Sequence, residues 1–193
     1  MLLKNEIISK IQESMAVKER MLANPSLLEN IEKVVDVIVS AYQNKKKVLL
    51  AGNGGSAADA QHIAAEFSGR FYFDRAPLPA EALHVNTSFL TAVANDYSYD
   101  EVYARMVKAS GEKGDVFIGI STSGNSSNII KAMEVARQKG MFIVAFTGEL
   151  GGKMKDCCDC LLNMPSNDTP RIQEAHITAA HIICEFVEKR LFS

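Results

Sequence analysis

Two pairs of side chains have the chemical types and the spacing of a metal site or an acid–base pair. His62 and Glu66 are four residues apart in a segment predicted to be helical, so both lie on one helix face. Gln173 and His181 are eight residues apart in the predicted last helix and share one broad face. Nitrogen and oxygen donors on two helices could hold Zn²⁺, or the glutamate and the histidine could transfer protons. The spacing leaves both functions open, and it is also common on solvated helix surfaces.

The other histidines and the cysteines are expected to have structural roles. His84 follows a strand-like run, and His176 lies off the helix face that carries His181. We interpret all four cysteines as reduced structural thiols, which is the usual state in a cytosolic chain: Cys157, Cys158, Cys160 and Cys184.

Two turns rich in glycine and hydroxyl side chains follow predicted strands. Residues 52–56 follow the apolar run 48–51, and residues 121–126 follow the run 115–120. In an open parallel sheet, ligands bind beyond the carboxyl ends of the strands, where helix N-termini offer free N–H groups and a positive dipole end. Neither turn contains a basic residue. We therefore expect a phosphate held by hydroxyls and backbone amides, on a polyhydroxylated molecule.

Other ligand-binding and catalytic motifs fit these turns less well. Residues 52–57 satisfy G-x-G-x-x-A, but no acidic residue ends the following strand, which argues against a dinucleotide site. Ser121 lies in G-x-S-x-S, whereas a nucleophile elbow requires G-x-S-x-G. The chain also has no G-x-x-x-x-G-K-[ST] motif for a P-loop.

The alternation of helical and strand-like segments predicts a single α/β domain spanning residues 1–193. Two amphipathic helical patterns fill residues 1–44 and predict a helical hairpin, whose apolar stripe must cover the rest of the chain or pair with another subunit. Strand–turn–helix units with unbroken apolar strands are typical of a three-layer sandwich around a parallel sheet. Strands are expected at 48–51, 80–85, 115–120, 141–146 and 160–164, and a final helix at 170–191.

The composition excludes several classes of function. The 193 residues include 21 basic and 23 acidic side chains, so the net charge of −2 gives no positive field for nucleic acid. The chain has no Trp and only 7% aromatic residues, which argues against a base-stacking surface. Polar residues interrupt the N-terminal apolar pattern, which argues against a signal peptide. No stretch reaches the roughly 18 apolar residues of a membrane span. We expect a cytoplasmic protein that binds neither nucleic acid nor membranes.

The ordered set of motifs resembles the sugar isomerase (SIS) domain family and, within it, the phosphoheptose isomerases. The resemblance covers nearly the full length and rests on segments 51–62, 66–70, 94–96, 119–126, 147–148, 151–152 and 171–176, and on His181. It implies a flavodoxin-like, five-stranded parallel sheet and one Zn²⁺ per subunit. It also implies a homotetramer with active sites at subunit interfaces, for which the hairpin 1–44 is an expected contact surface.

The resemblance further implies a role for each matching residue. Glu66 is the expected general base, and His181 is its expected partner acid or base. The expected zinc ligands are His62, Glu66, Gln173 and His181. The expected contacts to the sugar phosphate are Asn53, Gly54, Gly55, Ser56, Glu66, Arg70, Asn95, Asp96, Ser121, Thr122, Ser123, Ser126 and Gln173.

The reaction implied by the resemblance is an aldose–ketose isomerisation. Sedoheptulose 7-phosphate would become D-glycero-D-manno-heptose 7-phosphate through a cis-enediol, as a first step toward nucleotide-activated heptose for bacterial surface glycans. The alternative is a noncatalytic SIS-domain regulator that binds the replication initiator DnaA. Such regulators lack the acid at the position of Glu66 and the imidazole at the position of His181, so the presence of both favours the enzyme.

Overall fold

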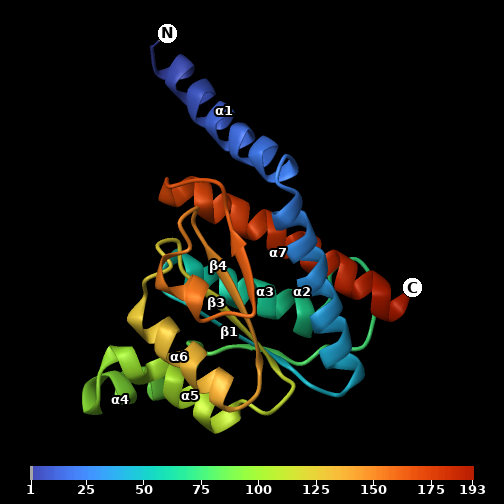
Figure 1. The fold of residues 1–193 in the computed structure, drawn as a ribbon, viewed down its shortest axis with the longest axis vertical. Coiled ribbons are helices and arrows are strands. Elements are labelled where there is room, and N and C mark those ends of the chain that lie inside the picture. Colours follow the sequence, from blue (N-terminus) through green and yellow to red (C-terminus); the bar gives the residue numbers. More distant parts are fainter. Residues whose placement is uncertain (1) are drawn as a thin grey trace.

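The fold is built around a parallel sheet whose strands overlap the five predicted segments, although the strand predicted at 80–85 already ends at Ala82. The computed structural model describes residues 2–193. Five parallel strands lie in the order β2-β1-β3-β4-β5 (Figure 1). They are β1 (Val48–Gly52), β2 (Ala80–Ala82), β3 (Val116–Ile120), β4 (Phe142–Thr147) and β5 (Cys160–Asn163). This is the strand order of flavodoxin-like sheets, so the predicted α/β fold is confirmed.

Helices cover both faces of the sheet and complete the three layers. One layer contains α2 (Pro25–Gln43), α3 (Gly55–Ser68) and α7 (Thr169–Phe192), and the other contains α4 (Thr87–Asp96), α5 (Val102–Ser110) and α6 (Ser127–Gln138). Alternate strand residues point into the two layers, so Leu50 packs in the first apolar cluster and its neighbour Leu49 in the second. Every residue of β1 and β3 is therefore buried.

The segment between β2 and β3 contains two helices that the apolar pattern does not predict. These are α4 and α5, which are joined by the 3₁₀ turn η1 (Tyr99–Glu101). The Asn86 side chain caps α4 by accepting a hydrogen bond from the Phe89 N–H at 3.0 Å. Only Val93 of α4 is buried, so this helix has no apolar stripe from which it could be predicted. A second 3₁₀ turn, η2 (Gly152–Asp156), follows β4.

The two predicted N-terminal helices are present, but they do not fold back on one another as a hairpin. The chain bends at Ala23 and Asn24, where α1 (Leu2–Leu22) ends and α2 begins. Figure 1 shows α1 running past α7 and away from the sheet. Val17 and Met21, near the end of α1, are buried in the core. The rest of α1 is a projecting arm, because its own chain offers no second surface to cover it.

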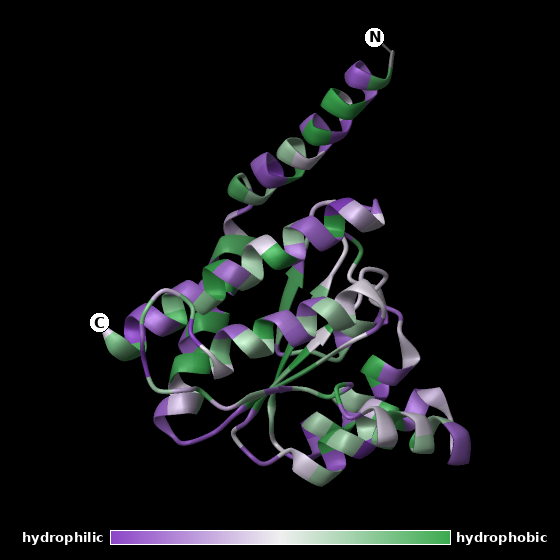
Figure 2. Cartoon of the chain, turned by 180° about the vertical axis from the view of Figure 1, so that it is seen from behind, coloured by the Kyte–Doolittle hydropathy of each residue, from purple (hydrophilic) through white to green (hydrophobic). Residues whose placement is uncertain are grey.

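The projecting part of α1 exposes large apolar side chains. Leu3 is 68% exposed and Ile11 is 57% exposed. Hydrophobic and hydrophilic segments alternate along the helix in Figure 2. Within residues 2–193, no helix has both the length and the apolar character that crossing a bilayer requires.

Candidate active site

The two polar turns lie together at the point where the strand order reverses. β1 and β3 are neighbours at the centre of the sheet, with β2 on one side and β4 on the other. The turn 52–56 leaves the carboxyl end of β1, and the turn 121–126 leaves the carboxyl end of β3. We call them the glycine loop and the serine loop. Ligands of open α/β sheets bind in the crevice at this switch point.

The backbone of the glycine loop packs closely against the first turn of α3. Gly54 has a φ of +56°, a conformation that L side chains rarely adopt, and a Cβ on Gly52 would overlap the Ser56 backbone. Gly54 and Gly55 are exposed, whereas Ser56 is buried. The first turn of α3 therefore presents N–H groups beside Gly54 and Gly55, while the Ser56 side chain lies below the surface.

The serine loop gathers three hydroxyl groups at the start of α6. Ser121 Oγ lies 2.8 Å from Ser126 Oγ and 3.3 Å from Ser123 Oγ. Ser126 is the N-cap residue of α6, so the hydroxyls meet the positive end of the helix dipole. Thr122 faces a small cavity that Ser123 also lines. Hydroxyl donors at a helix N-terminus are suited to binding a phosphate group.

A second glycine-rich segment, residues 148–152 after β4, packs against the backbone of the serine loop. Gly124 has a φ of +64°, and a Cβ on it would overlap the Gly151 carbonyl oxygen. The Gly148 N–H donates to the Thr122 carbonyl at 2.9 Å, and the Met154 N–H donates to the Gly124 carbonyl at 3.0 Å. Backbone lies directly against backbone here, which only glycine permits.

An amide pair links the glycine loop to the first turn of α6. Asn53 and Asn128 exchange two side-chain hydrogen bonds of 2.9 Å, and Asn128 is buried in the first turn of α6. Tyr99 Oη donates to Asn53 Oδ1 at 3.2 Å, and Tyr103 Oη donates to the Gly52 carbonyl. Asn128, Tyr99 and Tyr103 carry no signal in the sequence that points to this site, because their contact with the glycine loop exists only in the folded chain.

His62 and Glu66 on α3 meet one member of the second candidate pair, His181 on α7. His62 Nε2 lies 3.1 Å from Glu66 Oε1 and 3.1 Å from His181 Nε2. Ligand atoms of all three residues lie within 4.8 Å of one another. We call His62, Glu66 and His181 the His/Glu cluster. The spacing predicted that His62 and Glu66 share a helix face, and the packing of α3 on α7 adds His181.

The His/Glu cluster fits a zinc ion in both donor type and spacing. Two imidazole nitrogens and one carboxylate oxygen are common zinc donors. Bond lengths of about 2.0–2.1 Å in a tetrahedral site separate neighbouring ligand atoms by about 3.3 Å, close to the 3.1 Å found here. His62 and His181 face each other through Nε2, so the two rings share one hydrogen bond at most, which a bound cation would replace.

Gln173, the fourth expected ligand, lies at the other end of α3. A Cβ on Gly55 would overlap Gln173 Nε2, so this side chain packs on the first turn of the helix. A rise of 1.5 Å per residue separates Gly55 from His62 by about 10 Å. Gln173 therefore lies beside the glycine loop.

Asp59 is a further acidic residue next to the His/Glu cluster. It precedes His62 by one helical turn, and its Oδ2 is buried without a hydrogen-bond partner among residues 2–193. Burial raises the pKa of Asp59, while the nearby His62 and His181 oppose this rise. Its position three residues before His62 is the sequence signal that could have singled it out.

The remaining expected contact residues are exposed and lie outside these groups. Arg70 follows the end of α3. Asn95 and Asp96 end α4, where Asn95 Nδ2 donates to Asp96 Oδ1 at 2.9 Å. Their exposure makes all three side chains accessible to a ligand or to another subunit.

The two other histidines are held within the protein. His176 is buried, and its Nε2 lies 3.0 Å from the Thr147 carbonyl oxygen. Burial lowers the pKa of His176 to about 4, so the ring is neutral at neutral pH. Burial also lowers the pKa of His84. These environments are consistent with the structural roles expected for both.

The chain is similar to curated proteins along nearly its whole length. Residues 11–148 match the family model described as SIS domain. The phosphoheptose isomerase of Aneurinibacillus thermoaerophilus is 57% identical over 186 residues, which cover 96% of this chain and 94% of the relative. The phosphoheptose isomerase of Clostridium acetobutylicum is 53% identical, with 98% of this chain and 97% of the relative covered.

Solved structures match the fold to the same extent. Phosphoheptose isomerase GmhA from Neisseria gonorrhoeae is 40% identical with a TM-score of 0.91, over 97% of this chain and 99% of that one. A phosphoheptose isomerase from Francisella tularensis is 34% identical with a TM-score of 0.93, over 98% and 100% of the two chains. Motifs, fold and full-length similarity coincide, and the chain belongs to the phosphoheptose isomerases of the SIS-domain family.

Proposed function

We propose that this protein isomerises sedoheptulose 7-phosphate to D-glycero-D-manno-heptose 7-phosphate. The observation that carries the proposal is the His/Glu cluster, which adds an acid–base pair to a chain with a phosphate-type serine loop. The full-length relatives named phosphoheptose isomerase support the seven-carbon substrate. A noncatalytic regulator of DnaA needs neither Glu66 nor His181, so their meeting favours the enzyme.

The serine loop is the proposed phosphate site. Ser121, Thr122, Ser123 and Ser126 would donate hydroxyl hydrogen bonds, and the N-terminus of α6 adds its dipole. Hydrogen bonds to a charged group are stronger than those between neutral groups, so this site needs no lysine or arginine. The sugar hydroxyls are assigned to Asn53, Gly54, Gly55, Ser56, Arg70, Asn95, Asp96 and Gln173.

The proposed chemistry needs one group for carbon and one for oxygen. The Glu66 carboxylate would remove a proton from C1 of the ketose and return it to C2 of the cis-enediol. His181 would move the hydroxyl proton from the C1 oxygen to the C2 oxygen, because an imidazole both gives and takes protons near neutral pH. Both carbons then exchange oxidation levels without any external oxidant.

The donor set also supports one Zn²⁺ per subunit. His62, Glu66 and His181 would hold it. Gln173 packs on Gly55 at the other end of α3 and would have to move to become the fourth expected ligand. Direct ligation would also compete with Glu66 acting as a free base. Bound there, zinc would supply Lewis acidity toward the substrate oxygens. Metal analysis of protein purified without a histidine tag should find about one zinc per chain, and His62→Gln should lower that content. Metal-free protein with full activity would contradict the zinc assignment.

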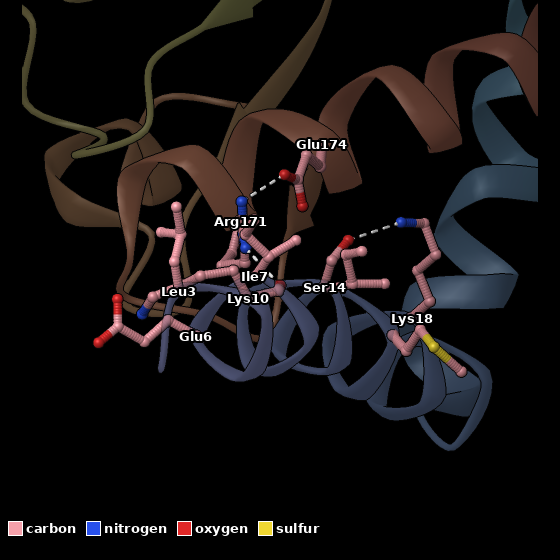
Figure 3. A pocket seen from close by; sticks show the side chains of 10 residues that line it. Leu3, Glu6, Ile7, Lys10, Ser14, Lys18, Arg171 and Glu174 are labelled. Atoms are coloured by element: carbon pink, nitrogen blue, oxygen red, sulfur yellow. Dashed lines mark hydrogen bonds and ion pairs between the residues drawn. The ribbon is translucent and has the colours of Figure 1, made fainter. Parts of the chain in front are cut away.

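The exposed surface of α1 supports the proposed homotetramer. Leu3 and Ile7 of α1 lie beside Arg171 of α7, whose Nη1 donates to the Lys10 carbonyl at 2.8 Å (Figure 3). Apolar side chains in such a groove are typical of a surface that another chain covers. Leu3→Glu together with Ile7→Glu should reduce the mass measured by light scattering. An unchanged mass would exclude α1 from the interface.

Distances within one chain support active sites shared between subunits. The rise along α3 puts Glu66 about 16 Å from Gly55 at the glycine loop. The loops and the His/Glu cluster of one chain are thus separated by most of the length of α3. A second copy of the chain could place its own cluster beside the loops of the first and so complete one site.

The cytoplasmic location and the surface-glycan pathway remain predictions from the sequence.

Solvent exchange at carbon is the decisive test of the proposed reaction. In D₂O, the protein should introduce deuterium at C1 or C2 of sedoheptulose 7-phosphate and form the aldose, as detected by NMR. The same assay with sedoheptulose lacking phosphate should show little turnover, because the serine loop would be unfilled. Binding of the phosphorylated sugar without exchange or product would contradict the isomerase and favour a binding protein.

A further inference from the structure

A buried ion pair lies beside the His/Glu cluster, and the proposed chemistry does not use it. Arg75 Nε lies 2.9 Å from Glu188 Oε1, and both side chains are only 2% exposed. Arg75 belongs to the segment 69–79 that follows α3, and Glu188 belongs to α7. The pair therefore joins the same two helices that carry the cluster.

Glu188 fixes the backbone of the segment after α3. Its two carboxylate oxygens accept hydrogen bonds from the N–H groups of Phe71, Tyr72 and Phe73 at 2.9, 2.6 and 3.0 Å. Burial works to raise the pKa of Glu188, but these three amides and Arg75 outweigh it and lower the pKa. Glu188 is thus a carboxylate with every accepting direction occupied.

Arg75 fixes the end of α3. Its Nη2 donates to the Glu66 carbonyl at 2.8 Å, and its Nη1 donates to the Phe67 carbonyl at 2.8 Å. The last carbonyls of a helix have no partner within it, and a cation there also favours the helix dipole. The planar guanidinium satisfies these two carbonyls and Glu188 together, which an ammonium group does not.

Both ends of this network touch the residues assigned to proton transfer. Arg75 holds the backbone of Glu66 itself. Glu188 holds the backbone of Phe71, whose ring centroid lies 5.8 Å from that of His181. The network therefore connects the last turn of α3 to the ring that packs against His181.

The energetics of buried charges indicate a role in geometry. Removing two charges from water is so unfavourable that a buried ion pair often stabilises a fold no better than apolar residues of the same size. A fully hydrogen-bonded pair does, however, permit only one arrangement of the segments that it joins. Here those segments are α3, α7 and residues 71–73.

We propose that Arg75 and Glu188 are positioning residues for the isomerase, which set the Glu66 carboxylate and the His181 imidazole in their reactive arrangement. The inference rests on the proposed function, because it assigns an effect on proton transfer. Neither side chain touches the substrate in this proposal. Both act through the backbone of Glu66 and the ring of Phe71.

The test uses two conservative variants and separates kcat from KM. Arg75→Lys keeps the positive charge beside Glu188 but loses the paired hydrogen bonds that the guanidinium donates to the Glu66 and Phe67 carbonyls. Glu188→Gln keeps the shape but turns one acceptor into a donor that faces backbone N–H groups. Displacements of about 1 Å at reacting groups can lower rates by about 10²-fold. We expect kcat to fall by about 10- to 100-fold in both variants, with KM within about twofold of the parent.

A matched control comes from another buried carboxylate, Asp115. Asp115 is buried, accepts from the Lys47 and Glu112 N–H groups, and pairs with Lys47 Nζ at 2.8 Å. None of these residues belongs to α3, α7 or the segment 69–79. Asp115→Asn should lower the melting temperature while kcat stays near that of the parent.

The possible results separate this inference from the proposed function. An active parent, with kcat reduced in folded Arg75→Lys but not in Asp115→Asn, supports positioning. An active parent whose folded Arg75→Lys and Glu188→Gln keep full kcat overturns the inference and leaves the isomerase standing. If Glu188→Gln does not fold, Arg75→Lys alone decides. A parent that neither exchanges deuterium nor forms aldose overturns the proposed function and, with it, this inference.

Discussion

The serine loop and the His/Glu cluster are built in opposite ways. Gly124 packs backbone against backbone on Gly151, and the loop hydroxyls meet within a segment of six residues. The His/Glu cluster instead consists of side chains that project from two helices, and the His62 side chain is 48% exposed. One site is fixed by local backbone geometry, and the other depends on how α3 packs against α7.

This difference matches the proposed roles, in which the serine loop binds the phosphate and the His/Glu cluster transfers protons. A loop that is held by glycine contacts and helix dipoles can hold a phosphate in one place before any reaction occurs. The surroundings of a side chain on a packed helix can shift its pKa, as burial raises the pKa of Asp59. Changes to the loop should therefore act on folding and KM, and changes to the cluster on kcat.

The largest effect is expected from the cluster. Glu66→Gln removes the proposed base and should lower kcat by about 10³-fold, because general bases contribute about 10²–10⁴-fold. Deuterium exchange at C1 and C2 in D₂O measures the loss directly. Glu134→Gln, an exposed glutamate on α6, is the control and should retain full exchange. Persistent exchange in Glu66→Gln would show that another group is the base.

The next largest effect is expected from the backbone of the serine loop. Gly124→Ala combines a left-handed φ with an overlap at Gly151, and each contributes about 1–2 kcal/mol, so the free energy of unfolding should fall by about 3 kcal/mol. Gly140→Ala has a similar φ of +73° but meets only the flexible Lys113 side chain, so it should lose about 1 kcal/mol. Urea denaturation measures both. Equal losses would mean that the Gly124–Gly151 contact is not tight.

A pH-dependent effect on stability is expected at the buried ring of His176. Its folded pKa of about 4 is below the ordinary 6.5, so the unfolded chain takes up the proton first as the pH falls. The stabilisation is fully present above about pH 6.5 and is lost between there and about pH 4, by about 3 kcal/mol at most. His176→Gln keeps a donor for the Thr147 carbonyl and does not titrate. Its unfolding free energy should change less over this range, and an unchanged slope would contradict the buried neutral ring.

The smallest effect is expected from a single hydroxyl of the serine loop. Ser126→Ala removes one donor from the proposed phosphate site and should raise KM on the order of tenfold at nearly constant kcat, because one charge-assisted hydrogen bond is lost. Steady-state kinetics with sedoheptulose 7-phosphate measures this change. Ser127→Ala is the neighbouring control, since that hydroxyl donates to Asp100. A loss of kcat in Ser126→Ala would contradict the division between binding and chemistry.

The sheet and most of its helices could be predicted because their residues carry a periodic pattern. Strands such as β3 are unbroken apolar runs, and α2 repeats its apolar residues at helical spacing. In contrast, α4 buries only Val93 and carries no such pattern. The prediction that residues 1–44 form a hairpin was wrong. The apolar stripe on α1 shows that the helix packs against some surface, but the sequence does not show whether that surface is α2, the rest of the chain or another subunit.

The candidate site divides in the same way. Sequence alone determined the polar turns, their place at strand ends and the shared helix face of His62 and Glu66, because each depends on residues that are near one another in the chain. Only the tertiary structure decided that His62 meets His181, that Asn128 holds Asn53, and that Arg75 caps α3 against Glu188. Such contacts join segments far apart in sequence, and the packing of helices on the sheet determines which side chains meet.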